Sequence, residues 1–143
     1  MARGALLLAV VDDDADVRVA LTRLVSSAGF TVETFASGAD FLHSVQDHEP
    51  DCVVLDLHMP EMSGFDVQGA LATGHPAVPV VVMTGHDAPE TRSRAIQLGA
   101  KVYLCKPIND EALLAAIGNA IGGTSTCIGD TRLSTLTTPR CDP

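Results

Sequence analysis

Tryptophan is absent from this chain of 143 residues, and aromatic residues make up only 3% of it. Any core must therefore be largely aliphatic, which is feasible because 46% of the residues are hydrophobic. No apolar run approaches the roughly 20 residues that a membrane-spanning helix needs. Leu6–Val11 superficially resembles part of a signal peptide, but no small-residue cleavage site follows and three aspartates come next. We expect a globular, cytoplasmic chain without membrane contact.

Basic residues are also scarce, with 9 lysines and arginines against 18 acidic residues and a net charge of −9. This excess of negative charge repels a phosphate backbone, so direct nucleic-acid binding by this chain is not expected. The cysteines show no C-x-x-C spacing, and a disulfide framework is not expected in so apolar a chain. Cys52 and Cys105 fall in strand-like runs, where we expect small buried side chains. The pattern favours a reducing compartment.

Five short apolar runs alternate with longer amphipathic segments along the chain. Strands that are buried on both faces have continuous rather than alternating apolar sequences. The strands predicted on this basis are Leu6–Val11, Phe30–Phe35, Cys52–Asp56, Val78–Met83 and Val102–Cys105. The second of these is the most polar, so we expect it at an edge of the sheet.

Helical periodicity fills the intervals between the predicted strands. The first helix repeats apolar residues at helical spacing and is expected to stop at Gly29. Ser37 and Ser63 are suited to cap the second and third helices, which we expect to run to about residues 46 and 72. A fourth helix is predicted at residues 89–98, and a fifth follows with Asn109 or Asp110 as its cap.

This (βα)5 alternation predicts an α/β fold, with a doubly wound parallel five-stranded sheet and right-handed crossovers. The expected strand order is 2-1-3-4-5, which makes the first and third strands neighbours at the point where such sheets bind ligands. Residues 1–122 are expected to form this domain. Residues 123–143 are rich in Thr and Pro and lack periodicity, so we expect a poorly ordered tail or linker remnant.

Polar residues stand at the ends of four predicted strands. Asp12 and Asp13 follow the first strand, Asp56 ends the third, Thr84 follows the fourth and Lys106 follows the fifth. Because the carboxyl ends of parallel strands share one edge of the sheet, we expect these groups to meet. Carboxylates, a hydroxyl and an ammonium group together suit a divalent cation and a phosphoryl group.

The acidic run after the first strand also has a simpler interpretation. Carboxylates are favourable at a helix N-terminus, whatever the function of the protein. This interpretation suits Asp14 and Asp16 well. It suits Asp12 and Asp13 poorly, because they belong to the larger set of polar groups at the strand ends.

These motifs resemble the receiver domain of the response regulators of two-component signalling systems. V-V-D-D follows the first strand, D-x-x-M-P-x-M-S-G the third, T-G the fourth and K-P the fifth. The match runs from residue 5 to about residue 121 and implies the flavodoxin-like receiver fold, in which the K-P peptide bond is typically cis. The sequence looks most like receivers of transcriptional regulators that carry a C-terminal helix-turn-helix domain, which is not among these residues.

The resemblance implies a phosphorylation site and a metal site. Asp56 is expected to accept a phosphoryl group from a histidine kinase or phosphotransfer protein. Asp12, Asp13, Asp56 and the backbone carbonyl of His58 are expected to bind Mg²⁺, with Mn²⁺ able to substitute. No other cofactor is expected. Gly64, in the loop after Asp56, is expected where a side chain would obstruct the backbone.

The resemblance also implies groups that assist the reaction and transmit it. Lys106 and Thr84 are expected to act as catalytic groups by contacting phosphoryl oxygens. Thr84 and Tyr103 are expected to form the switch, although Tyr103 could instead be a half-exposed packing aromatic. His58 and His86 are expected to tune the lifetime of the phosphoryl group, although they could also be ordinary loop histidines.

The main hypothesis is a phosphorelay switch that assists only its own phosphorylation and dephosphorylation and is not otherwise an enzyme. Phosphorylation would alter a surface on the fourth helix, fifth strand and fifth helix, leading to homodimerisation or target binding and to control of transcription through a further domain. One alternative is a phosphatase similar to the haloacid dehalogenase class, with Asp12 as its nucleophile. Another is a receiver-like binding module that never takes phosphate.

Overall fold

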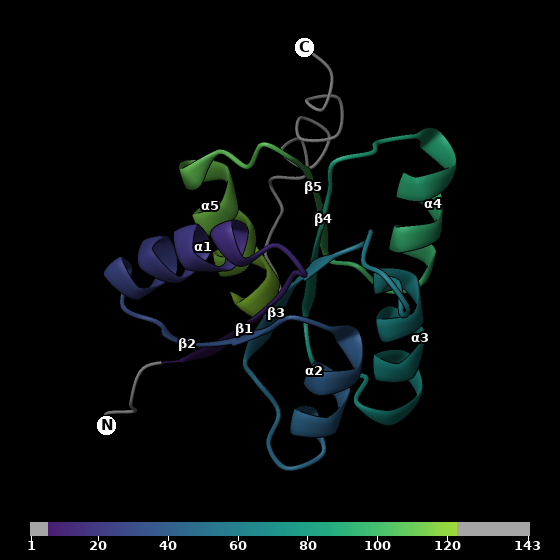
Figure 1. The fold of residues 1–143 in the computed structure, drawn as a ribbon, viewed down its shortest axis with the longest axis horizontal. Helices are drawn as coiled ribbons and strands as arrows, with labels where there is room; N and C mark the ends of the chain where they lie inside the picture. The colour runs from purple at the N-terminus through teal and green to yellow at the C-terminus, as the bar shows by residue number, and fades with distance from the viewer. Residues whose placement is uncertain (1–5, 123–143) are drawn as a thin grey trace.

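Five strands and five helices alternate along the chain (Figure 1), in a computed structural model that describes residues 6–122. The strands are β1 (Leu7–Val11), β2 (Thr31–Phe35), β3 (Cys52–Asp56), β4 (Val80–Thr84) and β5 (Val102–Cys105). The helices are α1 (Ala15–Ser27), α2 (Gly38–Val45), α3 (Gly64–Gly74), α4 (Pro89–Gln97) and α5 (Asp110–Gly122). The predicted (βα)5 alternation is confirmed.

All five strands form one parallel sheet in the order β2-β1-β3-β4-β5, as predicted. The register pairs Val11 with Leu55, and Thr84 with Cys105, so that the strands end at a common edge. Strands β3 and β4 are buried along their whole length, whereas β2 is partly exposed at the edge. The prediction of buried strands from continuous apolar runs, and of an edge position for the more polar second strand, is therefore confirmed.

Two hydrophobic layers hold the helices against the sheet. Helices α1 and α5 cover one face, and α2, α3 and α4 cover the other (Figure 1). Alternate strand residues face opposite layers, so Val54 packs on the side of α1 and α5, while Val53 and Leu55 pack on the other side. Both layers are mainly aliphatic, with Phe41 and Tyr103 as the buried aromatic side chains.

Local capping residues set the helix ends. Ser37 and Ser63 cap α2 and α3, and the latter takes part in a capping box, as expected from their positions. Gly29 and Gly99 follow α1 and α4 with φ values of 101° and 103°, which favour glycine. Asn109, rather than Asp110, caps α5 through its side-chain oxygen.

The fourth strand begins later than predicted, at Val80 rather than at Val78. Pro79 has no N–H group to donate to the ladder, and Val78 bonds back to the carbonyl of His75 in a turn. The strand continues one residue further than expected, so Thr84 belongs to its end. This places the Thr84 hydroxyl on a rigid element.

The cysteine expectation holds at one strand position and is wrong at the other. Cys52 is a fully buried free cysteine, and burial raises its pKa to about 12. Cys105 is only partly buried and is disulfide-bonded. Strand propensity alone could not reveal this pairing.

Within residues 6–122, no helix combines the length and the apolar character needed to cross a membrane. The tail predicted at residues 123–143 lies outside the residues that the structure describes, as do residues 1–5. The boundary proposed at residue 122 therefore stays a prediction.

Candidate functional site

A shallow hollow of about 300 Å³ lies at the carboxyl edge of the sheet. Its walls come from the segments that follow β1, β3, β4 and β5. The lining residues are Asp12, Asp13, Asp14, Asp56, His58, Gly85, His86 and Lys106. Residues that are up to 94 positions apart in the chain therefore meet here, as the parallel strand ends predicted.

Three carboxylates form the acidic part of the hollow. One oxygen each from Asp12, Asp13 and Asp56 lies within 4.8 Å of the others. Asp12 is fully buried and Asp56 is 2% exposed, whereas Asp13 is open to solvent. Hard oxygen ligands beside an open face suit a cation such as Mg²⁺, which keeps several waters. The residues thus fit a divalent metal, while the part of the His58 carbonyl stays a prediction.

Lys106 connects two of these carboxylates. Its Nζ lies 3.0 Å from Asp12 Oδ2 and 3.4 Å from Asp56 Oδ1. Burial favours the neutral amine, but the hydrogen bond to Asp12 and the charges of Asp56 and Asp12 outweigh it, leaving the pKa of Lys106 raised. The side chain is therefore a fixed ammonium group. A Cβ on Gly85 would lie 3.9 Å from Lys106 Cδ, an ordinary van der Waals contact, so Gly85 lies directly beside the lysine stem.

Asp56 is held by its backbone surroundings as well as by charge. Its Oδ1 accepts a hydrogen bond from the His58 backbone N–H at 3.3 Å. Burial, followed by the charge of Asp12, raises the pKa of Asp56 to about 6, against the opposing effect of Lys106. Because this pKa still lies below neutral pH, the carboxylate is mostly ionised there. Its ionisation has an energetic cost, which a bound cation would relieve.

Gly64 is required by a close backbone approach beside Asp56. A Cβ at this position would lie 2.5 Å from the Asp56 carbonyl oxygen and 2.7 Å from Leu57 Cα. The Gly64 N–H donates to the Leu57 carbonyl at 2.9 Å, which holds the start of α3 against the end of β3. The expectation that a side chain would obstruct the backbone here is confirmed.

The Thr84 hydroxyl is fully buried and engaged by two histidines. Its Oγ1 accepts from the His86 backbone N–H at 2.9 Å and lies 3.1 Å from His58 Nδ1. The two imidazole rings pack edge to face, with centroids 4.6 Å apart. Partial burial, and then the charges of His86 and Lys106, lower the pKa of His58, which favours a neutral ring. The tautomer of that ring decides whether Nδ1 donates to the Thr84 hydroxyl or accepts from it. Both histidines therefore belong to the site.

Tyr103 is buried behind the site, with only 6% of its surface exposed. Its hydroxyl donates to Asp87 Oδ1 at 2.8 Å, and the Arg92 guanidinium lies 5.2 Å from the ring centroid. The alternative of a packing aromatic is right about packing, since Tyr103 lies in a hydrophobic core cluster, and wrong about exposure, since the side chain is not half-exposed. Burial and the bond to Asp87 both raise the pKa of Tyr103.

Sequence reasoning missed two supporting contacts. Arg18, on α1, donates from Nη1 to the Asp12 backbone carbonyl at 2.7 Å, and Asp87 binds Tyr103. Neither residue stands in a recognisable motif, since each contact depends on the folded positions of two elements. Asp14, by contrast, caps α1 by accepting from Asp16 N at 2.8 Å, which confirms its simpler interpretation.

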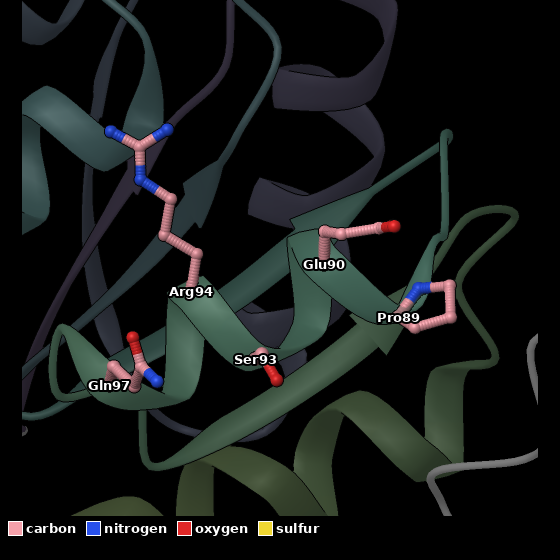
Figure 2. A pocket seen from close by; sticks show the side chains of 5 residues that line it. All are labelled: Pro89, Glu90, Ser93, Arg94 and Gln97. Carbon is pink, nitrogen blue, oxygen red and sulfur yellow. The ribbon is translucent and has the colours of Figure 1, made fainter.

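A larger hollow of about 480 Å³ lies on the surface of α4, away from the carboxylates. Figure 2 shows its side chains leaving the helix in different directions instead of converging on one point. They are Pro89, Glu90, Ser93, Arg94 and Gln97. Size alone would select this hollow, but the converging charged groups lie in the smaller one, which we take as the functional site.

Comparisons with known proteins agree with this geometry. The Response regulator receiver domain family matches residues 8–118. The response regulator protein TodT of Pseudomonas putida is 39% identical over 121 residues, covering 85% of this chain and 53% of TodT. The DNA-binding transcriptional regulator NtrC of Escherichia coli is 36% identical over 121 residues, covering 85% of this chain and 25% of NtrC.

A solved structure shows the same fold. Chemotaxis protein CheY4 of Vibrio cholerae superposes with a TM-score of 0.77 at 28% identity, covering 82% of this chain and 99% of CheY4. The chain spans about half the length of TodT and a quarter of NtrC, so it matches only one part of those relatives. Phosphoryl acceptance, exchange with histidine kinases or phosphotransfer proteins, and control of an output are general to the matched family. The chain belongs to the receiver domain family of two-component response regulators.

Proposed function

We propose that this chain is a phosphorelay receiver in which Asp56 takes a phosphoryl group from a histidine kinase or phosphotransfer protein. The convergence of Asp56, Asp12, Asp13 and Lys106 carries the proposal. An ionised Asp56 with an ammonium group 3.4 Å away combines a nucleophile with a positive charge ready for phosphoryl oxygens. The matched family supports the same role.

In the proposed reaction, a carboxylate oxygen of Asp56 attacks phosphorus as the bond from phosphorus to the donor nitrogen breaks. The product is an acyl phosphate, and the donor leaves as a histidine. Lys106 stabilises the negative charge on the transferred group, and Thr84 donates its hydroxyl to a phosphoryl oxygen after leaving His58. Mg²⁺, held by Asp12, Asp13, Asp56 and the His58 carbonyl, would neutralise further charge, and Mn²⁺ would substitute.

The phosphorylated chain would act by changing a surface built from α4, β5 and α5. Homodimerisation or binding of a target would follow, and the chain would catalyse nothing beyond its own phosphorylation and dephosphorylation. NtrC is named as a DNA-binding transcriptional regulator, which supports control of transcription through a further domain. A cytoplasmic location follows from the proposed kinase partner, whereas the disulfide-bonded Cys105 gives it no support.

The direct test of this proposal is intact mass after incubation with acetyl phosphate. We expect the parent chain to gain one phosphoryl group with Mg²⁺ and none with EDTA, because the acidic cluster needs a cation beside the incoming charge. Asp56→Asn should show no gain, whereas Asp47→Asn, the same change at an exposed position, should behave like the parent. A parent that gains no mass would contradict the proposal and favour a binding module that never takes phosphate.

The histidine pair is proposed to set the lifetime of the acyl phosphate. His58 and His86 flank Thr84 and line the hollow through which water must reach the phosphoryl group. We expect His58→Ala and His86→Ala to take up phosphate fully but to lose it at a changed rate, followed as intact mass over time. His43→Ala, at an exposed position outside the site, is the control. Decay rates equal to the parent in both variants would remove this role.

The raised pKa of Asp56 predicts a stability change with pH in the metal-free protein. The protonated form stabilises the fold fully below the ordinary value near 3.8, and this contribution is lost as pH rises through about 6. At pH 8 in EDTA, the free energy of unfolding of Asp56→Asn should therefore be higher than that of the parent by about 1–3 kcal/mol, measured by urea denaturation. This difference in unfolding free energy between the variant and the parent should become smaller at pH 5.

Mg²⁺ should reduce the difference in unfolding free energy between Asp56→Asn and the parent at pH 8, because it stabilises the parent more than a variant that lacks one ligand. Asp47→Asn should follow the parent throughout. If Asp56→Asn is less stable than the parent at pH 8 in EDTA, this contradicts the claim that the buried charge of Asp56 destabilises the metal-free protein.

A further inference from the structure

We propose that Asp87 is a positioning residue for Tyr103, holding the phenol in its buried place and tying it to the loop that follows Thr84. The contact stands on its own geometry. Its consequence for signalling rests on the proposed function, because only phosphorylation would move Thr84. The experiment below separates these two parts.

The first support is the pairing of a buried hydroxyl with a loop carboxylate. Tyr103 is 6% exposed, and its OH donates to Asp87 Oδ1 at 2.8 Å. A hydrogen bond to a charged acceptor is stronger than one between neutral groups. Without the carboxylate, the buried hydroxyl would lose this partner and the inward position of the ring would become less favourable.

Arg92 fixes the carboxylate from the other side. Its Nη2 lies 3.2 Å from Asp87 Oδ2, and its guanidinium lies 5.2 Å from the Tyr103 ring centroid. The three side chains come from α4, from the loop before it and from β5. A shift of any of these elements would therefore change the contacts of the Tyr103 side chain.

The loop that carries Asp87 also holds Thr84. The His86 backbone N–H donates to Thr84 Oγ1 at 2.9 Å, and Asp87 is the next residue along the chain. Tyr103 pairs across the sheet with Val82, two residues before Thr84 on β4. Movement of the Thr84 hydroxyl toward a phosphoryl group would break the bond from His86 and shift the loop, and with it the carboxylate that holds Tyr103.

The composition of the chain makes this contact measurable. Tyr103 is the only tyrosine and tryptophan is absent from the whole sequence, so emission excited at wavelengths that phenylalanine does not absorb reports on this side chain alone. A carboxylate that accepts the phenolic hydrogen bond quenches tyrosine emission. Burial and the bond to Asp87 also raise the pKa of Tyr103, so alkaline titration of absorbance gives a second readout.

The test uses the full chain and the variants Asp87→Ala and Asp87→Asn. In Asp87→Ala we expect stronger emission, easier quenching by acrylamide and a tyrosinate midpoint lowered by about one pH unit or more, toward the ordinary value near 10. Asp87→Asn keeps a neutral acceptor and should fall between the parent and Asp87→Ala. Because the Asp87 side chain is 30% exposed, these variants should fold, which circular dichroism checks. Asp47→Ala is the control.

Emission and titration in Asp87→Ala equal to those of the parent would overturn the positioning role. The second arm adds acetyl phosphate and Mg²⁺. The parent emission should change as its mass rises, whereas Asp87→Ala should gain the same mass with no emission change. An equal emission change in both proteins would overturn the coupling. If the parent gains no mass, the proposed function and the coupling fail together, while the first arm still decides whether Asp87 positions Tyr103.

Discussion

The burial of two carboxylates beside one ammonium group is the constraint on which the site depends. Asp12 and Asp56 end neighbouring strands and are almost inaccessible to solvent, so their negative charges repel each other where water screens them poorly. Lys106, from β5, lies within ionic contact of both. Removing the ammonium would leave uncompensated buried charge, which is strongly unfavourable. Because β1, β3 and β5 end at the same edge of the sheet, the long lysine side chain reaches both acids.

The same constraint links the chemistry to the rest of the molecule. The cost of ionising Asp56 makes the site receptive to a cation, and the positive charge of Lys106 suits a phosphoryl group. Two hydrogen bonds and one stretch of backbone then link the hollow to β5. The His86 N–H donates to Thr84 Oγ1, and Asp87, the next residue along the chain, accepts from the Tyr103 hydroxyl. Under the proposed function, a change in charge at the sheet edge would reach α4 and β5 through these contacts.

The sequence was sufficient for the sheet and for the groups at its edge, because both follow from local patterns. Continuous apolar runs mark buried strands, and parallel strands bring their carboxyl ends together, so Asp12, Asp56 and Lys106 could be placed in advance. The burial of Tyr103 and its bond to Asp87 could not, since they depend on how α4 packs against β5. Cys105 was missed because strand propensity carries no information about covalent pairing.

The most direct test of the central claim is to locate the phosphoryl group. After incubation with acetyl phosphate and Mg²⁺, borohydride reduction converts a phosphorylated aspartate to homoserine, and peptide mass mapping then finds the marked position. The receiver mechanism predicts the mark at Asp56 alone. A mark at Asp12 would contradict it and favour a phosphatase similar to the haloacid dehalogenase class.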